Sequence, residues 1–196
     1  MTSETDIGTL LAAAARSTAP VVRGIGDDRL GDPTPCADYT VRGLLNHLFQ
    51  VVIGFQELAA RRPAGFATAP DLLGDDPGWR ERFPVEAERL AAAWAVPGAE
   101  EGEVGAMGMP ARTVARMALL DLTVHGWDLA RAAGLPYAPD PAAVAECGSL
   151  VAELAPRGRE TRVFGEPVPV PGDAAALDRL LGATGRDPRW TVRVAG

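Results

Sequence analysis

The segment from Ala111 to Ala133, ARTVARMALLDLTVHGWDLARAA, places charged residues on an apolar helical face. On a helix with 3.6 residues per turn, His125 and Asp128 fall within about 40° of Asp121. Apolar residues flank this polar stripe, and Arg116 lies almost opposite it. A solvated stripe would show the reverse arrangement, so the sequence predicts a helix that turns a carboxylate and an imidazole toward the core. Burying such groups without partners costs on the order of several kcal/mol, so a partner is expected inside the fold.

Apolar residues at helical spacing predict further helices around this segment. Turn-rich segments separate them, and a Ser, Thr, Asp or Pro marks most of their starts. The central helix itself is expected to carry Pro110 at its first position. The other predicted helices are Ile7 to Val22, bent or ended near Pro20; Val41 to Arg61, capped by Thr40; a third that opens at Asp76-Pro77 or Pro84 and stops before Pro97; and Pro141 to Leu154.

The end of the chain has a weaker pattern. Arg162 to Pro171 is extended by its prolines, Asp173 to Ala183 is expected to form a short helix, and Thr191 to Ala195 alternates like a short strand. The sequence therefore predicts one domain over residues 1–196. A four-helix bundle occupies about 1–134, and a mixed C-terminal extension with a short helix and short β-strands occupies about 135–196.

Composition narrows the class of protein. The chain has 196 residues, is 47% hydrophobic and carries a net charge of −7. This charge argues against nucleic acid or an anionic membrane as a partner, and no stretch approaches the roughly 20 apolar residues of a membrane span. All 19 basic residues are Arg, which suggests a coding bias and gives a single surface Arg little weight. Cys36 and Cys147 form no CxxC pair, and Glu4 and Asp6 do not suit a signal peptide, so a cytoplasmic location is expected.

The only two histidines, His47 and His125, both lie in predicted core helices. The spacing Asp121-x3-His125 puts two potential metal ligands on one helix face, and His47 of a neighbouring helix would be the third. Three protein ligands leave coordination positions open, as in catalytic sites. The alternative interpretation is that Asp121 orients His125 by a hydrogen bond and His47 is a helix-edge residue.

Other arrangements of reactive residues have less support. A Cys36–His47 pair is conceivable, but Cys36 lies beside prolines before a helix, where a packing role is favoured. No serine has a G-x-S-x-G context, which argues against a hydrolase of that class. Two His and one carboxylate also match non-heme iron sites. Asp128 either holds a metal ligand by a hydrogen bond or forms a helix ion pair with Arg131, and the ion pair is favoured.

Three segments carry a resemblance to a known family. TPCADYTVRGLLNHL (Thr34 to Leu48) and DLTVHGWDLARAAG (Asp121 to Gly134) resemble paired signatures of the DinB-like superfamily. The branch they resemble is the actinobacterial one, similar to the metal-binding N-terminal domain of mycothiol-dependent maleylpyruvate isomerase. Phe164 to Trp190 is similar to the tail of a mostly uncharacterised subgroup there.

The resemblance implies an all-α, DinB-like four-helix bundle in up-down-down-up order. It also implies a divalent metal held by His47, Asp121 and His125, most commonly zinc, with nickel, iron or manganese as other candidates. Characterised relatives bind a low-molecular-weight thiol, mycothiol or bacillithiol, and transfer it or add it to an electrophile.

Two departures argue against maleylpyruvate isomerisation itself. Asp121 stands where the isomerase has Glu, which is one methylene longer. The separate C-terminal domain of the isomerase also has no room after Gly134.

The favoured hypothesis is an enzyme of mycothiol chemistry that transfers or adds a metal-bound thiolate to an electrophile. A regulatory metal- or ligand-binding module without turnover and a metal-dependent hydrolase are the alternatives, and no residue in the sequence separates the three. The expected partners are a small-molecule thiol and an electrophilic substrate, with neither nucleic acid nor membrane, in a monomer or homodimer.

Overall fold

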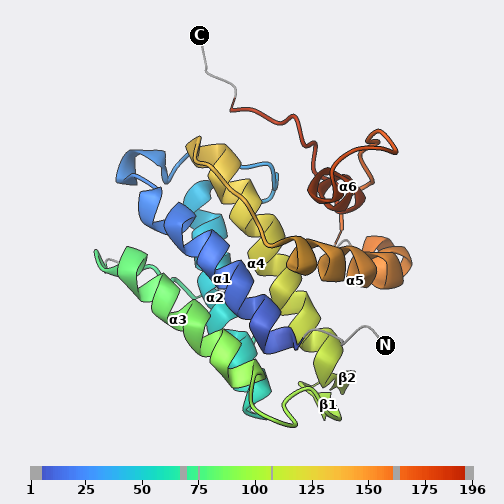
Figure 1. Ribbon diagram of the computed structural model, residues 1–196. Coiled ribbons are helices and arrows are strands. Elements are labelled where there is room, and N and C mark those ends of the chain that lie inside the picture. The colour runs from blue at the N-terminus through green and yellow to red at the C-terminus, as the bar shows by residue number, and fades with distance from the viewer. Residues whose placement is uncertain (1–5, 67–69, 75, 107, 161–163, 193–196) are drawn as a thin grey trace.

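The computed structural model describes residues 6–66, 70–74, 76–106, 108–160 and 164–192. Figure 1 shows α1 to α4 side by side as a bundle, with α5 running across α4 and α6 beside α5. None of the helices in these ranges is long and apolar enough to cross a membrane. The elements in chain order are α1 (Ile7–Gly24), the 3-10 turn η1 (Asp27–Arg29), α2 (Val41–Ala59), α3 (Trp79–Trp94), β1 (Glu103–Val104), β2 (Met109–Pro110), α4 (Ala111–Ala133), α5 (Pro141–Glu160) and α6 (Ala176–Ala183).

Contacts between the helices give their directions. Arg23, at the end of α1, pairs with Glu81 at the start of α3 at 3.0 Å, so these two helices are antiparallel. The ring of Phe49 in α2 lies 5.3 Å from that of Phe83 in α3. Further along both helices, Gln56 donates to Glu86 O at 3.1 Å, so α2 and α3 are parallel. Figure 1 shows α4 running in the direction of α1. The bundle therefore has the expected up-down-down-up order.

The central helix has the predicted bounds, Ala111–Ala133. Pro110 is not its first residue: it precedes the helix and pairs with Glu103 in the short antiparallel sheet of β1 and β2. At the other end Gly134 has a φ of +69°, and the Leu135 N–H donates to Ala130 O at 2.9 Å. This is a Schellman motif, which turns the chain back along the bundle.

Several predicted boundaries differ from the structure. The first helix continues past Pro20 to Gly24, because Pro20 lies on the exposed side, where water can take the hydrogen bond that its ring removes. The third opens at Trp79 and contains Pro84. The second ends at Ala59, and the fifth extends beyond Leu154 to Glu160. Thr40 does cap α2, accepting a hydrogen bond from the Gly43 N–H.

The C-terminal extension packs against the bundle. Arg116 of α4, expected opposite the polar stripe, is buried because α5 covers that face, and its guanidinium pairs with Glu146 and Glu153 of α5. The predicted short helix is confirmed as Ala176–Ala183. The strands found in the described residues lie before α4, whereas 191–192 have no regular structure and 193–196 lie outside the described residues.

The packing of α4 against α1 has a testable weak point at Gly126. A Cβ atom there would lie 2.7 Å from Thr18 Oγ1 and 2.8 Å from the Tyr137 hydroxyl oxygen. Both hydroxyls donate to carbonyls of α4. We expect Gly126→Ala to lower the free energy of unfolding by about 1–3 kcal/mol, measured by urea denaturation. The control is Gly148→Ala in α5, where a Cβ atom meets nothing within 4 Å. This substitution should raise the free energy of unfolding by about 0.5–1 kcal/mol, because alanine favours a helix more than glycine does. A stabilised Gly126→Ala would contradict the close packing.

Candidate metal centre

The structure brings His47, Asp121 and His125 together. His47 lies in the first half of α2, and the other two lie one turn apart in α4. One potential ligand atom from each of the three lies within 4.8 Å of those of the other two. The two imidazole rings are nearly perpendicular, with centroids 5.1 Å apart. The predicted three-residue set therefore forms one cluster between α2 and α4.

Asp128 fixes the orientation of the His125 ring. Its Oδ2 lies 2.9 Å from His125 Nδ1, and its side chain is fully buried. Asp128 does not form the ion pair with Arg131 that the sequence favoured. Arg131 is exposed and instead donates to Pro188 O of the C-terminal extension at 2.8 Å. A buried carboxylate behind a histidine is the usual arrangement around a metal-ligating imidazole.

The hydrogen bond to Asp128 leaves His125 Nε2 facing the other two residues. Asp121 Oδ1 lies 3.7 Å from this nitrogen, which is too far for a hydrogen bond. In the structure Asp121 therefore does not orient His125 by a hydrogen bond, as the alternative interpretation had it. Two ligands about 2.1 Å from a tetrahedral zinc ion lie about 3.4 Å apart, so the observed gap is close to the separation that an ion spans. The Asp121 side chain is 29% exposed, which leaves the cluster reachable from solvent.

The surroundings of His47 favour the neutral imidazole, which is the form that binds a metal. Burial lowers the pKa of the His47 imidazole below its ordinary value of 6.5, and the neighbouring His125 lowers it further, while Asp121 acts in the opposite direction. A neutral ring keeps a lone pair for coordination. The Tyr39 ring stacks on His47 with centroids 5.3 Å apart and covers one side of it.

A second group of potential ligands shares His125. Cys36, His125 and Asp128 also bring one ligand atom each within 4.8 Å of one another. Burial raises the pKa of the Cys36 thiol, which disfavours the thiolate that would bind a metal. The guanidinium of Arg186 also lies 3.2 Å from Asp128 Oδ2 and opposes a second cation there. The donor set of His47, Asp121 and His125 therefore fits a divalent ion better.

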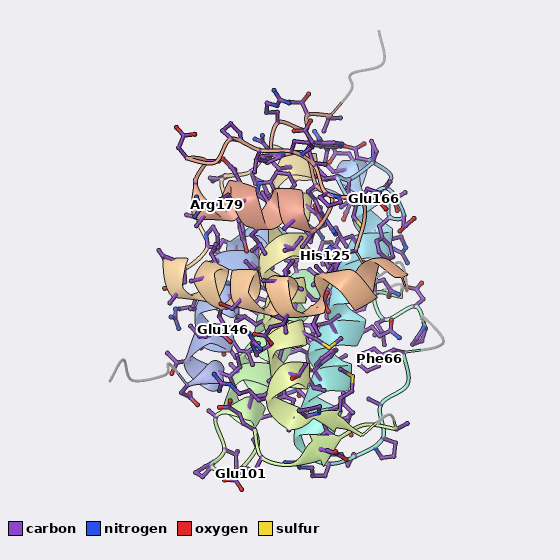
Figure 2. The ribbon with its side chains drawn as sticks, turned by 90° about the vertical axis from the view of Figure 1, so that its right-hand side faces the viewer. Phe66, Glu101, His125, Glu146, Glu166 and Arg179 are labelled. Atoms are coloured by element: carbon purple, nitrogen blue, oxygen red, sulfur yellow. The ribbon has the colours of Figure 1, made fainter. Side chains whose placement is uncertain are left out.

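Sequence reasoning missed two neighbours of the cluster and set aside a third. Tyr39 and Arg186 lie in segments that resemble the family but were assigned no role, and Cys36 was assigned to packing. Tyr39 and Cys36 come from the loop before α2, and Arg186 follows α6 near the end of the chain. Figure 2 labels His125 near the middle of the molecule, in the part of α4 that α5 and α6 overlie in that view. The site is thus built from the bundle, one loop and the extension.

Comparison with known proteins agrees with this architecture. The family described as the mycothiol maleylpyruvate isomerase N-terminal domain matches residues 11–130, which include all three predicted ligands and Asp128. Two uncharacterized proteins of Mycobacterium tuberculosis, MT0763 of strain CDC 1551 / Oshkosh and Rv0738 of strain H37Rv, are each 30% identical to the chain over 187 residues. Each alignment covers 87% of this chain and 92% of the relative. No solved structure matches the chain.

The ligand assignment can be separated from a packing role. We expect the purified protein to hold about one divalent ion per chain and His125→Ala to lose it with the helices retained. Leu48 is fully buried, so Leu48→Ala should cost about 2–5 kcal/mol of stability in the metal-free protein. His47→Ala should instead reduce zinc affinity with a much smaller loss of metal-free stability. Elemental analysis and urea denaturation measure both, and equal destabilisation by the two substitutions would refute the ligand role of His47.

The lowered pKa of His47 gives the metal-free protein a defined pH dependence. The unfolded chain takes up a proton at this residue near pH 6.5, whereas the folded protein does so only at lower pH. Because the unfolded state then binds more protons, stability should fall as the pH drops below about 6.5. The slope from this one group is at most about 1.4 kcal/mol per pH unit. Denaturation of metal-free wild type and His47→Gln at pH 7.5 and 5.5 measures the difference, and identical slopes would show that the fold does not depress this pKa.

Proposed function

Because this chain belongs to the family of the mycothiol maleylpyruvate isomerase N-terminal domain, we propose that it is a divalent-metal-binding protein of low-molecular-weight thiol chemistry. The observation that carries the proposal is the convergence of His47, Asp121 and His125 within the part of the chain that matches the family. The reaction we propose is transfer of a thiol, or its addition, to an electrophilic small molecule. Mycothiol is the thiol that the family description favours.

The donor atoms favour zinc as the metal. Two imidazole nitrogens and one carboxylate oxygen match the ligands of catalytic zinc sites, which leave at least one coordination position to water or substrate. Nickel, iron and manganese accept the same donors, so the geometry of the three residues does not exclude them. A bound divalent ion stabilises the deprotonated form of a coordinating thiol and so supplies a nucleophile at neutral pH.

The residues of the chain have separable tasks in this proposal. His47 and His125 provide imidazole nitrogens, and Asp121 provides a carboxylate on the partly exposed side of the cluster. Asp128 holds the His125 ring from behind. Tyr39 covers one side of His47 and narrows the approach of a ligand from that side. The proposal does not extend to maleylpyruvate isomerisation, because Asp121 is one methylene shorter than the Glu of the isomerase.

Thiol binding tests the proposal directly. We expect the zinc-loaded protein to bind mycothiol and to release a proton, since a coordinating thiol is deprotonated. Calorimetry in two buffers of different ionisation heat counts the released protons. The metal-free protein and the His125→Ala variant should bind mycothiol far more weakly. S-methylated mycothiol is the matched ligand control, because it keeps the rest of the molecule and has no thiol proton to release.

Other outcomes point to the alternative functions. Turnover of mycothiol with an electrophile such as chlorodinitrobenzene would support the transfer reaction. Thiol ligation without any turnover would favour a regulatory module, and ester or amide hydrolysis that added thiol inhibits would favour a hydrolase. Mycothiol binding that is equal with and without metal would overturn the proposal and leave only the metal site.

A further inference from the structure

We propose that Arg186, in the C-terminal extension, is a positioning residue of the metal centre and acts through Asp128 on His125. The inference rests on the proposed metal site, but not on thiol chemistry. Arg186 lies outside residues 11–130, which match the family, so neither the match nor the sequence motif assigns it a role. Its guanidinium reaches the site from a segment that follows the last helix.

The end of α6 directs Arg186 toward the bundle. Gly185 has a φ of +88°, and its N–H donates to Gly182 O. The Arg186 N–H donates to Leu181 O at 2.9 Å, which completes a Schellman motif. This motif reverses the chain and sets the next residues against α4. The hydrogen bond from Arg131 to Pro188 O holds the same segment in place.

Asp128 Oδ2 joins the two residues. It lies 2.9 Å from His125 Nδ1 and 3.2 Å from Arg186 Nη2. The Asp128 side chain is fully buried, and the Arg186 side chain is 11% exposed. Arg186 Nη1 also donates to Thr184 O at 2.9 Å, so the guanidinium is anchored to its own turn. A carboxylate oxygen that accepts from two sides has little freedom to rotate, and the imidazole it holds is fixed with it.

Arg186 also supplies the charge that this arrangement needs. A buried carboxylate is costly unless a positive group compensates it. Among the described residues, Asp128 Oδ1 has no hydrogen-bond partner. The polar contacts of this carboxylate are therefore those that Oδ2 makes with His125 and Arg186. With the guanidinium in place, the carboxylate stays at His125 Nδ1 and leaves Nε2 directed toward His47 and Asp121. Partners of this kind typically change metal affinity by about 10–100-fold when they are lost.

The test measures zinc affinity at one fixed pH by competition with a chromophoric chelator. We expect Arg186→Ala to weaken zinc binding about 10–100-fold and Arg186→Lys to restore part of the loss. Asp128→Asn should weaken it by at least as much. The double variant Arg186→Ala/Asp128→Asn should be no weaker than Asp128→Asn alone, because the two residues act in series. The absorption bands of the cobalt-substituted protein should also change in Arg186→Ala, since the His125 ring is then less firmly held.

Arg131→Ala is the matched control. It removes the contact with Pro188 that docks the same segment, but it leaves Asp128 untouched. Its zinc affinity and cobalt spectrum should stay near those of the wild type. If Arg186→Ala behaves like Arg131→Ala, or if the losses of Arg186→Ala and Asp128→Asn simply add, Arg186 only docks the extension and the inference is wrong. A wild-type protein that takes up no divalent ion would overturn the proposed function together with it, whereas failure of thiol binding alone would leave the role of Arg186 intact.

Discussion

Helix α4 is buried along most of its length, so the polar side chains that it turns inward need partners inside the fold. Arg116 meets this requirement with two glutamates of α5, and Asp128 meets it with His125 and Arg186. Asp121 and His125 Nε2 face each other at a separation too long for a hydrogen bond. These two groups are thus not paired with each other by a hydrogen bond, and the ring of His47 faces them across the interface between α2 and α4. The candidate site is therefore the part of the α4 polar stripe whose side-chain atoms are not used in hydrogen bonds or ion pairs that stabilise the described part of the fold.

The sequence contains enough information to predict the bundle and the cluster of three candidate ligands. The bounds of α4 and the shared face of Asp121 and His125 follow from helical periodicity alone. To place His47 in the same cluster, it was only necessary to assume that its helix packs against α4. Helix ends were harder to predict. Pro20 is tolerated within α1 because it is exposed, and the fifth helix continues past Leu154 to Glu160. Local composition does not reveal which prolines face water.

The partner of Asp128 shows why the rest could not be predicted. Arg131 lies three residues away on the same helix, and on a solvated helix such a pair is the natural expectation. The actual partner, Arg186, is 58 residues away in sequence and follows a short helix whose position depends on α5. The loop before α2 gives a similar case. Thr34 Oγ1 binds the carbonyl oxygens of Cys36 and Tyr39, and this local network sets both residues beside the histidines. The Asp128–Arg186 contact and the hydrogen bonds of Thr34 follow no periodic pattern in the sequence, so they could not be predicted from it.

The two groups of potential ligands meet on opposite nitrogens of one ring. In Asp121-x3-His125-x2-Asp128 the imidazole has a carboxylate on each side, and the protein treats the two sides differently. On the Nδ1 side, Asp128 is buried, hydrogen-bonded and compensated by the guanidinium of Arg186. A metal there would have to displace a proton and lie close to a fixed positive charge, which a low-dielectric interior makes costly. On the Nε2 side, Asp121 is partly exposed and burial lowers the pKa of His47. In the proposed site these charges favour a cation at Nε2, and the extension that carries Arg186 contributes to that preference from the Nδ1 side of the ring.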